Sequence, residues 1–178
     1  MRIISGIHRG RPIRPPANLP VRPTTDFAKE GLFDILTNRV VFEEIDALDL
    51  FAGTGSISYE LISRGCRSVL SVDRDPRCVS FIRKTAEMLK AENLEAIRDD
   101  VFRFVRTTPG KFDLIFADPP YDLEGIDSLP GLIQQNSLLE KDGIFIFEHS
   151  RNLDVRSVTG LFEERHYGNV NFSFFRFP

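Results

Sequence analysis

The sequence is poor in the residues that build metal centres and disulfide frameworks. Its 178 residues include only two cysteines, Cys66 and Cys78, and three histidines. The two cysteines are twelve positions apart, without CxxC spacing and without a histidine nearby. We therefore expect no bound metal and no disulfide, and the default state of such thiols is the reduced state of the cytosol.

Long apolar runs are missing as well. No 18 consecutive residues are apolar, and the first residues do not form the continuous apolar segment of an export signal. We expect a protein that is neither exported by a standard signal nor membrane-spanning. No repeat or low-complexity segment occurs. The 42% hydrophobic content and 16 phenylalanines are enough for one well-buried domain with a short extension.

Net charge is small, −3, but it is distributed unevenly. Residues 26–178 hold 18 Lys+Arg and 26 Asp+Glu, a balance of −8, whereas residues 1–25 hold five arginines and no acid. A basic arm on an acidic body is typical of nucleic-acid contact, although a solvated basic terminus without a partner is nearly as common. The candidate RNA-contacting residues are Arg2, Arg9, Arg11, Arg14 and Arg22.

Strand-like and helix-like segments alternate along most of the chain. The first residues suggest a short hairpin over 1–6 and then a proline-stiffened arm, followed by a helix that Thr25 or Asp26 caps. The pattern predicts strands at 45–51, 67–73, 94–99, 112–117 and 143–149, and helices at 56–64, 76–92, 101–106 and 126–136. Residues 162–168 and 169–177 predict an antiparallel hairpin. This order predicts an α/β fold with a mainly parallel sheet and helices on both faces.

Glycines or acids follow four successive predicted strands. In a parallel sheet these ends share one edge, and ligands bind there. A single Gly-x-Gly is weak evidence, but four ordered features at one edge indicate a nucleotide-type site. The features are Gly53 and Gly55, then Asp73, then Asp99 and Asp100, then Asp118 to Tyr121.

Phosphate-binding signatures are absent from this edge. Ser58 stands where a dinucleotide fingerprint has its third glycine, and no GK[ST] follows a glycine-rich loop. A ligand with a ribose and an adenine, and with a cationic or amino-acid end in place of phosphate, suits the acidic edge better. Asp49, on the first of these strands, could hold an ammonium group. S-adenosylmethionine (SAM) fits each of these features.

Two segments carry a family resemblance. LDLFAGTGSISYELISRG is similar to the cofactor loop of seven-stranded SAM-dependent methyltransferases, and DPPY resembles the catalytic motif of those that methylate amino groups conjugated to a π-system. Together with MRIISGIHRGRPI and RPTTDFAKEGLFDIL, the whole chain resembles the bacterial 16S ribosomal RNA guanine-N2 methyltransferases of the RsmD type. The resemblance implies a Rossmann-like seven-stranded sheet, with a basic arm at 1–22 and a methyltransferase domain at 23–178.

The resemblance also implies a role for each matching position. It implies that SAM is the cofactor, that 16S ribosomal RNA or the small ribosomal subunit is the partner, and that the protein is a cytoplasmic monomer without a metal. The methionine end of SAM would contact Asp49, Phe51, Gly53 and Gly55, the ribose Asp73, the adenine Asp100 and Val101, and the target base Asp118, Pro119 and Tyr121. Two positions depart from the pattern: Asp73 is shorter than the expected Glu, and Phe27 stands where an Arg is frequent.

The DPPY segment has a physical rationale of its own. The exocyclic amine of guanine is a poor nucleophile because its lone pair is delocalised into the ring. Asp118 and the Pro119 carbonyl could accept its two hydrogens and orient the nitrogen, and orientation is a large part of catalysis. The prolines keep that carbonyl out of a sheet ladder. Tyr121 could stack on the base, a contact of about 1–3 kcal/mol.

Three alternatives stay open at this stage. DNA adenine-N6 methyltransferases also use DPPY, but they usually add a target-recognition domain for which 178 residues leave no room. Release-factor glutamine methyltransferases more often have Asn at position 118 and a separate helical domain. A non-catalytic SAM- or nucleotide-binding module is the third. Glu148 and His149 end the fifth predicted strand, and we expect them to be ordinary strand-end polar residues.

Overall fold

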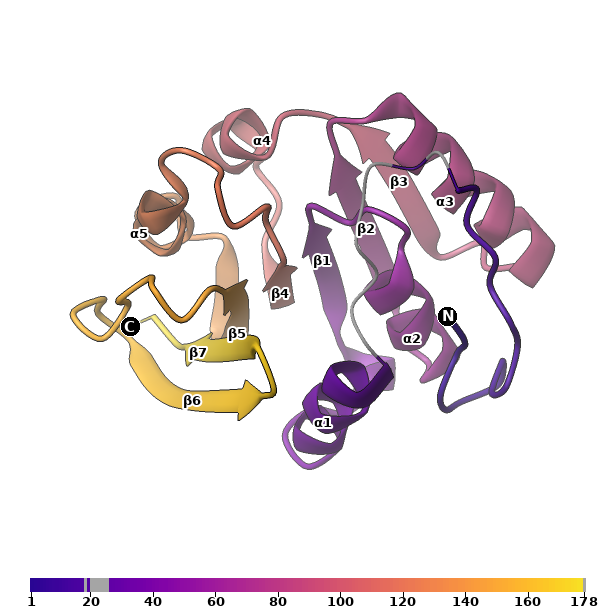
Figure 1. Cartoon of the computed structure of the whole chain (residues 1–178), viewed down its shortest axis with the longest axis horizontal. Helices are drawn as coiled ribbons and strands as arrows, with labels where there is room; N and C mark the ends of the chain where they lie inside the picture. The colour runs from indigo at the N-terminus through magenta and orange to yellow at the C-terminus, as the bar shows by residue number, and fades with distance from the viewer. Residues whose placement is uncertain (18, 20–25, 178) are drawn as a thin grey trace.

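The computed structural model describes residues 1–17, 19 and 26–177 and consists of one seven-stranded sheet with helices on both faces (Figure 1). The strands are β1 (Asp46–Leu50), β2 (Ser68–Asp73), β3 (Leu94–Arg98), β4 (Phe112–Ala117), β5 (Leu139–His149), β6 (Leu161–Tyr167) and β7 (Val170–Phe175). The helices are α1 (Asp26–Thr37), α2 (Ser56–Ser63), α3 (Pro76–Leu89), α4 (Val101–Thr107) and α5 (Leu129–Gln135), with 3-10 turns η1 (Phe42–Glu44) and η2 (Ile126–Ser128).

The strand order is β3-β2-β1-β4-β5-β7-β6. The first five of these strands run parallel, and β7 pairs antiparallel with both β5 and β6. The predicted mainly parallel sheet with a C-terminal antiparallel hairpin is therefore confirmed. The order reverses between β1 and β4, because the chain first builds outward to β3 and then returns to the other side of β1. Ligands bind at such a switch point in open α/β sheets.

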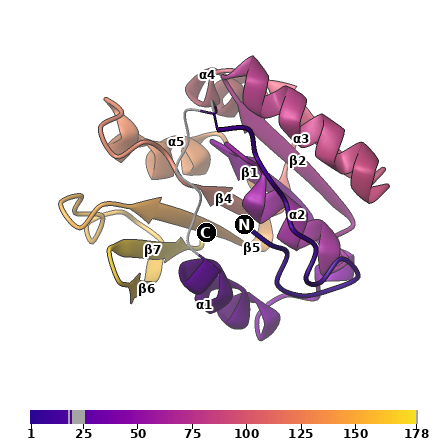
Figure 2. The same cartoon turned by 45° about the vertical axis from the view of Figure 1, so that its right-hand side comes forward.

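Two apolar layers lie on opposite faces of the sheet, because side chains alternate along each strand. Leu114 and Phe116 pack into one layer with α1, α2 and α3, whereas Ile115 packs into the other with α4 and α5 (Figure 2). Phe172 and Phe175 are fully buried in different layers, so β7 contributes to both. In the described part of the chain, no helix has the length and apolarity needed to cross a bilayer.

The fifth strand differs most from its predicted bounds. It begins at Leu139 rather than 143, because Leu139 already pairs with Phe112 before the register shifts. Asp142 has a positive φ of 66° at this irregularity, which explains why DG at 142–143 read as a break in the sequence. The predicted helix at 126–136 is also divided, into η2 and α5.

The N-terminal segment folds back on itself across a wider loop than predicted. Hydrogen bonds join residues 1–3 to residues 10–13, including Ile3 N to the Arg11 carbonyl at 3.1 Å. They form a single antiparallel bridge, between Arg2 and Pro12, rather than a short hairpin within residues 1–6. Pro12 has no N–H to extend the ladder. The predicted domain boundary at 22/23 and the predicted Thr25 cap lie outside the described residues.

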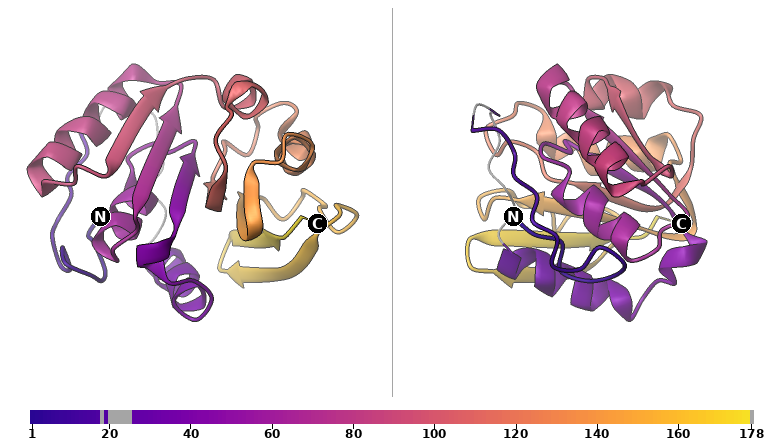
Figure 3. Two further views of the ribbon diagram at one scale, coloured as in Figure 1. Left: turned by 180° about the vertical axis from the view of Figure 1, so that it is seen from behind. Right: turned by 90° about the vertical axis from the view of Figure 1, so that its right-hand side faces the viewer.

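The N-terminal segment runs alongside α2 (Figure 3), and side chains of α2 accept hydrogen bonds from its backbone. The Glu60 carboxylate accepts hydrogen bonds from Ile4 N at 2.8 Å and Ser5 N at 3.0 Å. Gly6 passes so close to the helix that a Cβ there would lie 1.7 Å from the Ser63 carbonyl oxygen. Lys29, 1% exposed, donates to the Arg2 carbonyl at 2.7 Å and lies 3.9 Å from Glu60. The segment is therefore part of the packed structure.

Candidate active site

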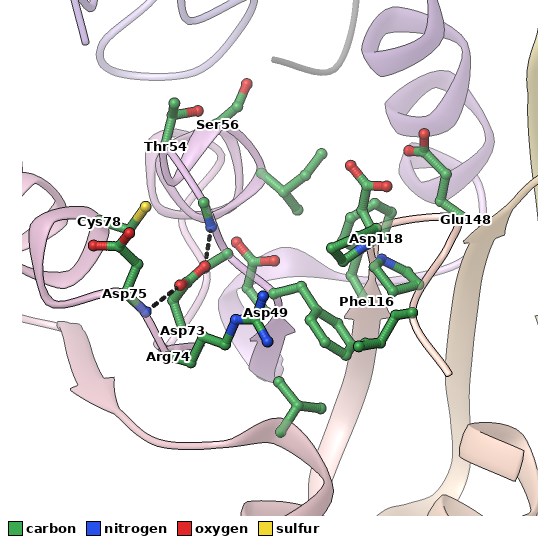
Figure 4. Close-up of a pocket in the computed structure, with 18 of the residues that line it drawn as sticks. Asp49, Thr54, Ser56, Asp73, Arg74, Asp75, Cys78, Phe116, Asp118 and Glu148 are labelled. Carbon is green, nitrogen blue, oxygen red and sulfur yellow. Dashed lines mark hydrogen bonds between the residues drawn. The ribbon is translucent and has the colours of Figure 1, made fainter. Parts of the chain in front are cut away.

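A cavity of about 780 Å³ lies at the carboxyl ends of β1, β2, β4 and β5, where the strand order reverses. That volume is within the usual range for a cofactor or small-molecule site. Figure 4 shows Asp73 and Asp75 on one side of it, Asp118 and Glu148 on the other, and Asp49 between them.

The loop after β1 turns through unusual backbone conformations. Phe51 and Gly53 both have positive φ angles, 58° and 54°, and both line the cavity. A non-glycine residue held in this region is strained, and such strain clusters at ligand sites. Gly55 also has a positive φ, 77°, but it does not line the cavity: a Cβ there would lie 2.7 Å from the Tyr59 ring. The structure thus gives Gly55 a packing role at the start of α2.

Asp73 ends β2 with its carboxylate held by the backbone. One oxygen accepts from Gly53 N and the other from Asp75 N, both at 2.8 Å. The side chain is 9% exposed and faces the cavity. Each oxygen keeps a lone pair, so the oriented carboxylate can accept two further hydrogen bonds, as from the paired hydroxyls of a ribose.

Asp100 and Val101 form the next part of the wall, at the start of α4. Asp100 is the N-cap of this helix, and its carboxylate accepts a hydrogen bond from Arg103 N at 3.0 Å. Val101 is 3% exposed and supplies an apolar surface beside it. An acceptor next to an apolar side chain suits a flat heterocycle with an amino group.

Asp49 is a buried acid on β1. It is 2% exposed and accepts a hydrogen bond from Ser58 Oγ. Burial, with smaller contributions from Asp118 and Asp73, raises the pKa of Asp49 to about 7. A positively charged ligand group would stabilise its ionised form.

The DPPY segment follows β4 and places a second acid across the cavity. Burial, and then the neighbouring Glu148, raises the pKa of Asp118 well above its usual value. Tyr121 is 49% exposed at the mouth, and its hydroxyl donates to Glu148 Oε1 at 3.2 Å. Asp118, Pro119 and Tyr121 all line the cavity. The structure therefore gathers the whole segment at one wall.

The cavity is strongly acidic for its size. Among the described residues its charged lining consists of one arginine and seven acids: Arg74, Asp49, Asp73, Asp75, Asp100, Asp118, Asp122 and Glu148. A phosphate group would be repelled here, whereas a ligand with a sulfonium and an ammonium would be attracted. The residues present therefore fit SAM, with Asp49 placed for its charged end and Asp73 for its ribose.

The N-terminal arginines are not part of the cavity wall. Arg2 forms ion pairs with Asp26 at 3.4 Å and Glu30 at 3.6 Å. Arg9, Arg11 and Arg14 are exposed to solvent. Arg22 lies outside the described residues. These side chains can contact only parts of a large ligand that extend beyond the cavity.

Sequence reasoning undervalued Glu148 and also missed Asn169 and Val170. Glu148 lines the cavity at 4% exposure, so it is more than an ordinary strand-end residue. The available signal was its place at the end of β5, beside the DPPY strand. Asn169 and Val170 reach the cavity from the β6–β7 turn, which only the tertiary fold brings there. His149 Nδ1 donates to the Ser150 carbonyl at 2.9 Å, and its Nε2 shares a hydrogen bond with the Ser173 hydroxyl at 2.8 Å, so the ring is held within the strand packing.

The sulfur and histidine chemistry of the described residues is limited. Both cysteines are free and buried. Over residues 1–17, 19 and 26–177, no group of three or more His, Cys, Asp or Glu side chains is arranged to hold a metal ion.

Known proteins match this chain along nearly all of its length. Ribosomal RNA small subunit methyltransferase D of Haemophilus influenzae is 30% identical over 183 aligned positions, covering 95% of this chain and 94% of the relative. The protein of that name from Escherichia coli K12 is 28% identical, covering 83% and 74%. A Thermus thermophilus hypothetical protein of known structure has a TM-score of 0.85 at 26% identity, covering 99% of both chains.

The family model described as conserved hypothetical protein 95 matches residues 1–176. That match includes the N-terminal segment, the cavity loop and the DPPY strand. The chain therefore belongs to the conserved hypothetical protein 95 family, the RsmD-type family of methyltransferases.

Proposed function

We propose that this protein transfers the methyl group of SAM to the exocyclic N2 of a guanine in 16S ribosomal RNA, within a small-subunit particle. The observation that carries the proposal is the half-buried Asp118 carboxyl, which follows β4 on the cavity wall together with Pro119 and Tyr121. The names of the Haemophilus and Escherichia relatives support a small-subunit RNA substrate.

The cofactor would lie between the β1 loop and α4. SAM, when bound, supplies an electrophilic methyl carbon on its sulfonium. Asp49 holds the ammonium end, Asp73 the ribose hydroxyls, and Asp100 with Val101 the adenine. The positive φ angles of Phe51 and Gly53 make the loop turn tightly, and the absence of a side chain at Gly53 lets the backbone approach the ligand closely.

The DPPY residues would orient the nucleophile. Asp118 and the Pro119 carbonyl accept the two N2 hydrogens, which directs the nitrogen at the methyl carbon. SAM would supply the methyl carbon for the new N–C bond, with the electron pair of its C–S bond going to sulfur, and the Asp118 carboxylate would accept the N2 proton. The half-exposed Tyr121 stacks on the base at the mouth.

The basic arm would contact the phosphates outside the cavity. Arg9, Arg11 and Arg14 are exposed, whereas the cavity itself is acidic. A polyanion is therefore excluded from the interior while a single neutral base can enter. The proposal also includes a basic arm over 1–22, a methyltransferase domain over 23–178, and a cytoplasmic protein that acts as a monomer.

Methyl transfer from labelled SAM tests the proposal. Small-subunit particles from a strain lacking this gene should gain about one methyl per particle, and nucleoside analysis should identify it as N2-methylguanosine. Large subunits from the same strain serve as the control and should stay unlabelled. Label in N6-methyladenosine would contradict the assignment of the base, and calorimetry without SAM binding would contradict the assignment of the cofactor.

A further inference from the structure

The Glu148 carboxylate is buried and incompletely bonded. Glu148 lies near the end of β5, beside the end of β4, because Ala117 pairs with Phe147 immediately before it. One carboxylate oxygen accepts a hydrogen bond from the Tyr121 hydroxyl at 3.2 Å. The other, Oε2, is buried and has no N–H or hydroxyl donor among the described residues; the remaining contact of the carboxyl is with the Asp118 carboxyl. Such a group in a cavity wall indicates a missing donor.

Glu148 and Asp118 form an acid pair without a cation. No Lys or Arg of the described chain forms an ion pair with either side chain. Burial raises the pKa of Glu148 to about 7, and burial together with the neighbouring Glu148 raises that of Asp118 well above its usual value. Without a ligand the two carboxyls can share one proton. With a ligand, two adjacent N–H donors would satisfy the pair.

Guanine presents this arrangement of donors. Its N1–H and its N2 amino group are neighbours on one edge of the ring, and both donate. Adenine has an acceptor, N1, beside its amino group, and an acceptor facing a carboxylate is repelled. The distinction lies in a single position, N1, next to the amine that is methylated.

We propose that Glu148 selects guanine by accepting the hydrogen bond of its N1–H, beside the N2 amino group that Asp118 holds. Tyr121 would fix the carboxylate through its hydroxyl while its ring contacts the base. This inference rests on the proposed function, and it assigns to Glu148 the choice between bases. Sites built to bond a substrate N–H reject analogues that lack it by large factors, because the buried group is left unpaired.

The test changes N1 of the substrate base from a donor to an acceptor, and changes one oxygen of the protein side chain to an amide nitrogen. The substrates are particles reconstituted with 16S ribosomal RNA that carries either guanine or 2-aminopurine at the mapped position. 2-Aminopurine keeps the N2 amine, but its N1 is an acceptor. Glu148→Gln offers an N–H to that acceptor and changes the volume of the side chain very little. The intrinsic reactivities of the two amines cancel when the variant is compared with the wild type.

We expect the wild-type protein to prefer guanine by 100-fold or more in kcat/KM. Glu148→Gln should reduce that preference at least tenfold, through a lower rate on guanine and a higher rate on 2-aminopurine. Asp122→Asn removes another, exposed carboxylate of the same cavity and should leave the preference unchanged. SAM affinity should match the wild type in both variants, which shows that both are folded.

Equal losses on both substrates in Glu148→Gln would overturn the inference, because a residue that only shapes the site does not distinguish N1–H from N1. An unchanged preference would overturn it as well. Failure of the proposed function looks different: the wild-type protein would then bind SAM and methylate no guanine, which is seen before any variant is made.

Discussion

Two clusters of charged side chains in this molecule, each built around a buried acid, have opposite surroundings. Glu60, fully buried on α2, is bonded to two backbone amides and to Arg64 Nε at 3.0 Å, with Lys29 at 3.9 Å. At the cavity Glu148 is buried and Asp118 is half-buried, and no basic side chain of the described residues pairs with them. The first cluster is complete within the protein, whereas the second needs a ligand.

The difference teaches which buried charge stabilises the fold and which serves the site. Glu60 joins the N-terminal segment to α2 and α1, so its contacts are structural. Burial lowers the pKa of Lys29, and Glu60 beside it acts in the opposite direction and favours the ammonium. At the cavity, burial raises the pKa of Asp49, Asp118 and Glu148, and neighbouring carboxylates raise those of Asp49 and Asp118 further. An incomplete cluster of this kind indicates function.

The largest expected effect is on catalysis, from Asp118→Ala. Removing the acceptor of the N2 proton should lower methyl transfer by about 10³-fold or more, measured with labelled SAM on small-subunit particles. SAM affinity, measured by calorimetry, should change only a few-fold, because Asp49 and Asp73 remain. Retained transfer would remove Asp118 from the mechanism.

Glu60→Ala should break the structural cluster instead. It leaves Lys29 buried without its acid, and breaking such a pair costs about 3–5 kcal/mol. Denaturant unfolding should show this loss, while the folded fraction keeps its affinity for SAM. Glu95→Ala, an exposed acid on β3, is the control and should change stability little. A Glu60→Ala protein as stable as the control would show that the segment is held by other contacts.

Asp49→Asn should act in the opposite direction on stability. Because burial raises the pKa of Asp49 to about 7, the folded protein must ionise a buried acid above that pH. The wild type therefore loses stability as the pH rises from about 4 to 7, and the Asn variant should be about 1–3 kcal/mol more stable at pH 8. Thermal unfolding should show no gain at pH 4.

The same substitution sharpens the assignment of Asp49 to the cofactor. SAM affinity at pH 8 should fall, because Asn offers no charge to the ammonium group. A gain in stability with unchanged SAM affinity would place the ammonium elsewhere in the cavity. Asp73 and Asp118, the acids that face Asp49, are unaltered in this variant.

The smallest effect concerns the exposed arginines, which belong to neither cluster. Replacing Arg9 and Arg11 by Ala should reduce the slope of log affinity against log salt by about 0.7 for each lost single-strand phosphate contact. Filter binding of the RNA over a range of salt measures this. Lys111 and Lys141, which are exposed near the amino-terminal ends of β4 and β5, form the control pair. An unchanged slope would make the arm arginines solvated charges only.

Much of the cavity could be predicted because it is built from strand ends. A buried strand appears in the sequence as a short apolar run, and the residue after it in a parallel sheet lies at the ligand edge. Asp73, Asp100 and Asp118 were placed at the cavity in this way, and the structure brings all three to its wall. The role of Gly55 was harder, since only the neighbouring Tyr59 ring shows why a side chain cannot fit there.

The sequence by itself determined the order of strands and helices, the acidic edge and the DPPY wall, because these depend on local periodicity and on residues adjacent in the chain. Only the tertiary structure decided that Glu148 faces Asp118, that the 169–170 turn reaches the cavity, and that Glu60 secures the N-terminal segment. The residues that meet in these contacts are 30 to 121 positions apart in the sequence. The 169–170 turn also belongs to antiparallel strands at the edge of the sheet. Their energies depend on burial and on missing or present partners, which a linear pattern does not record.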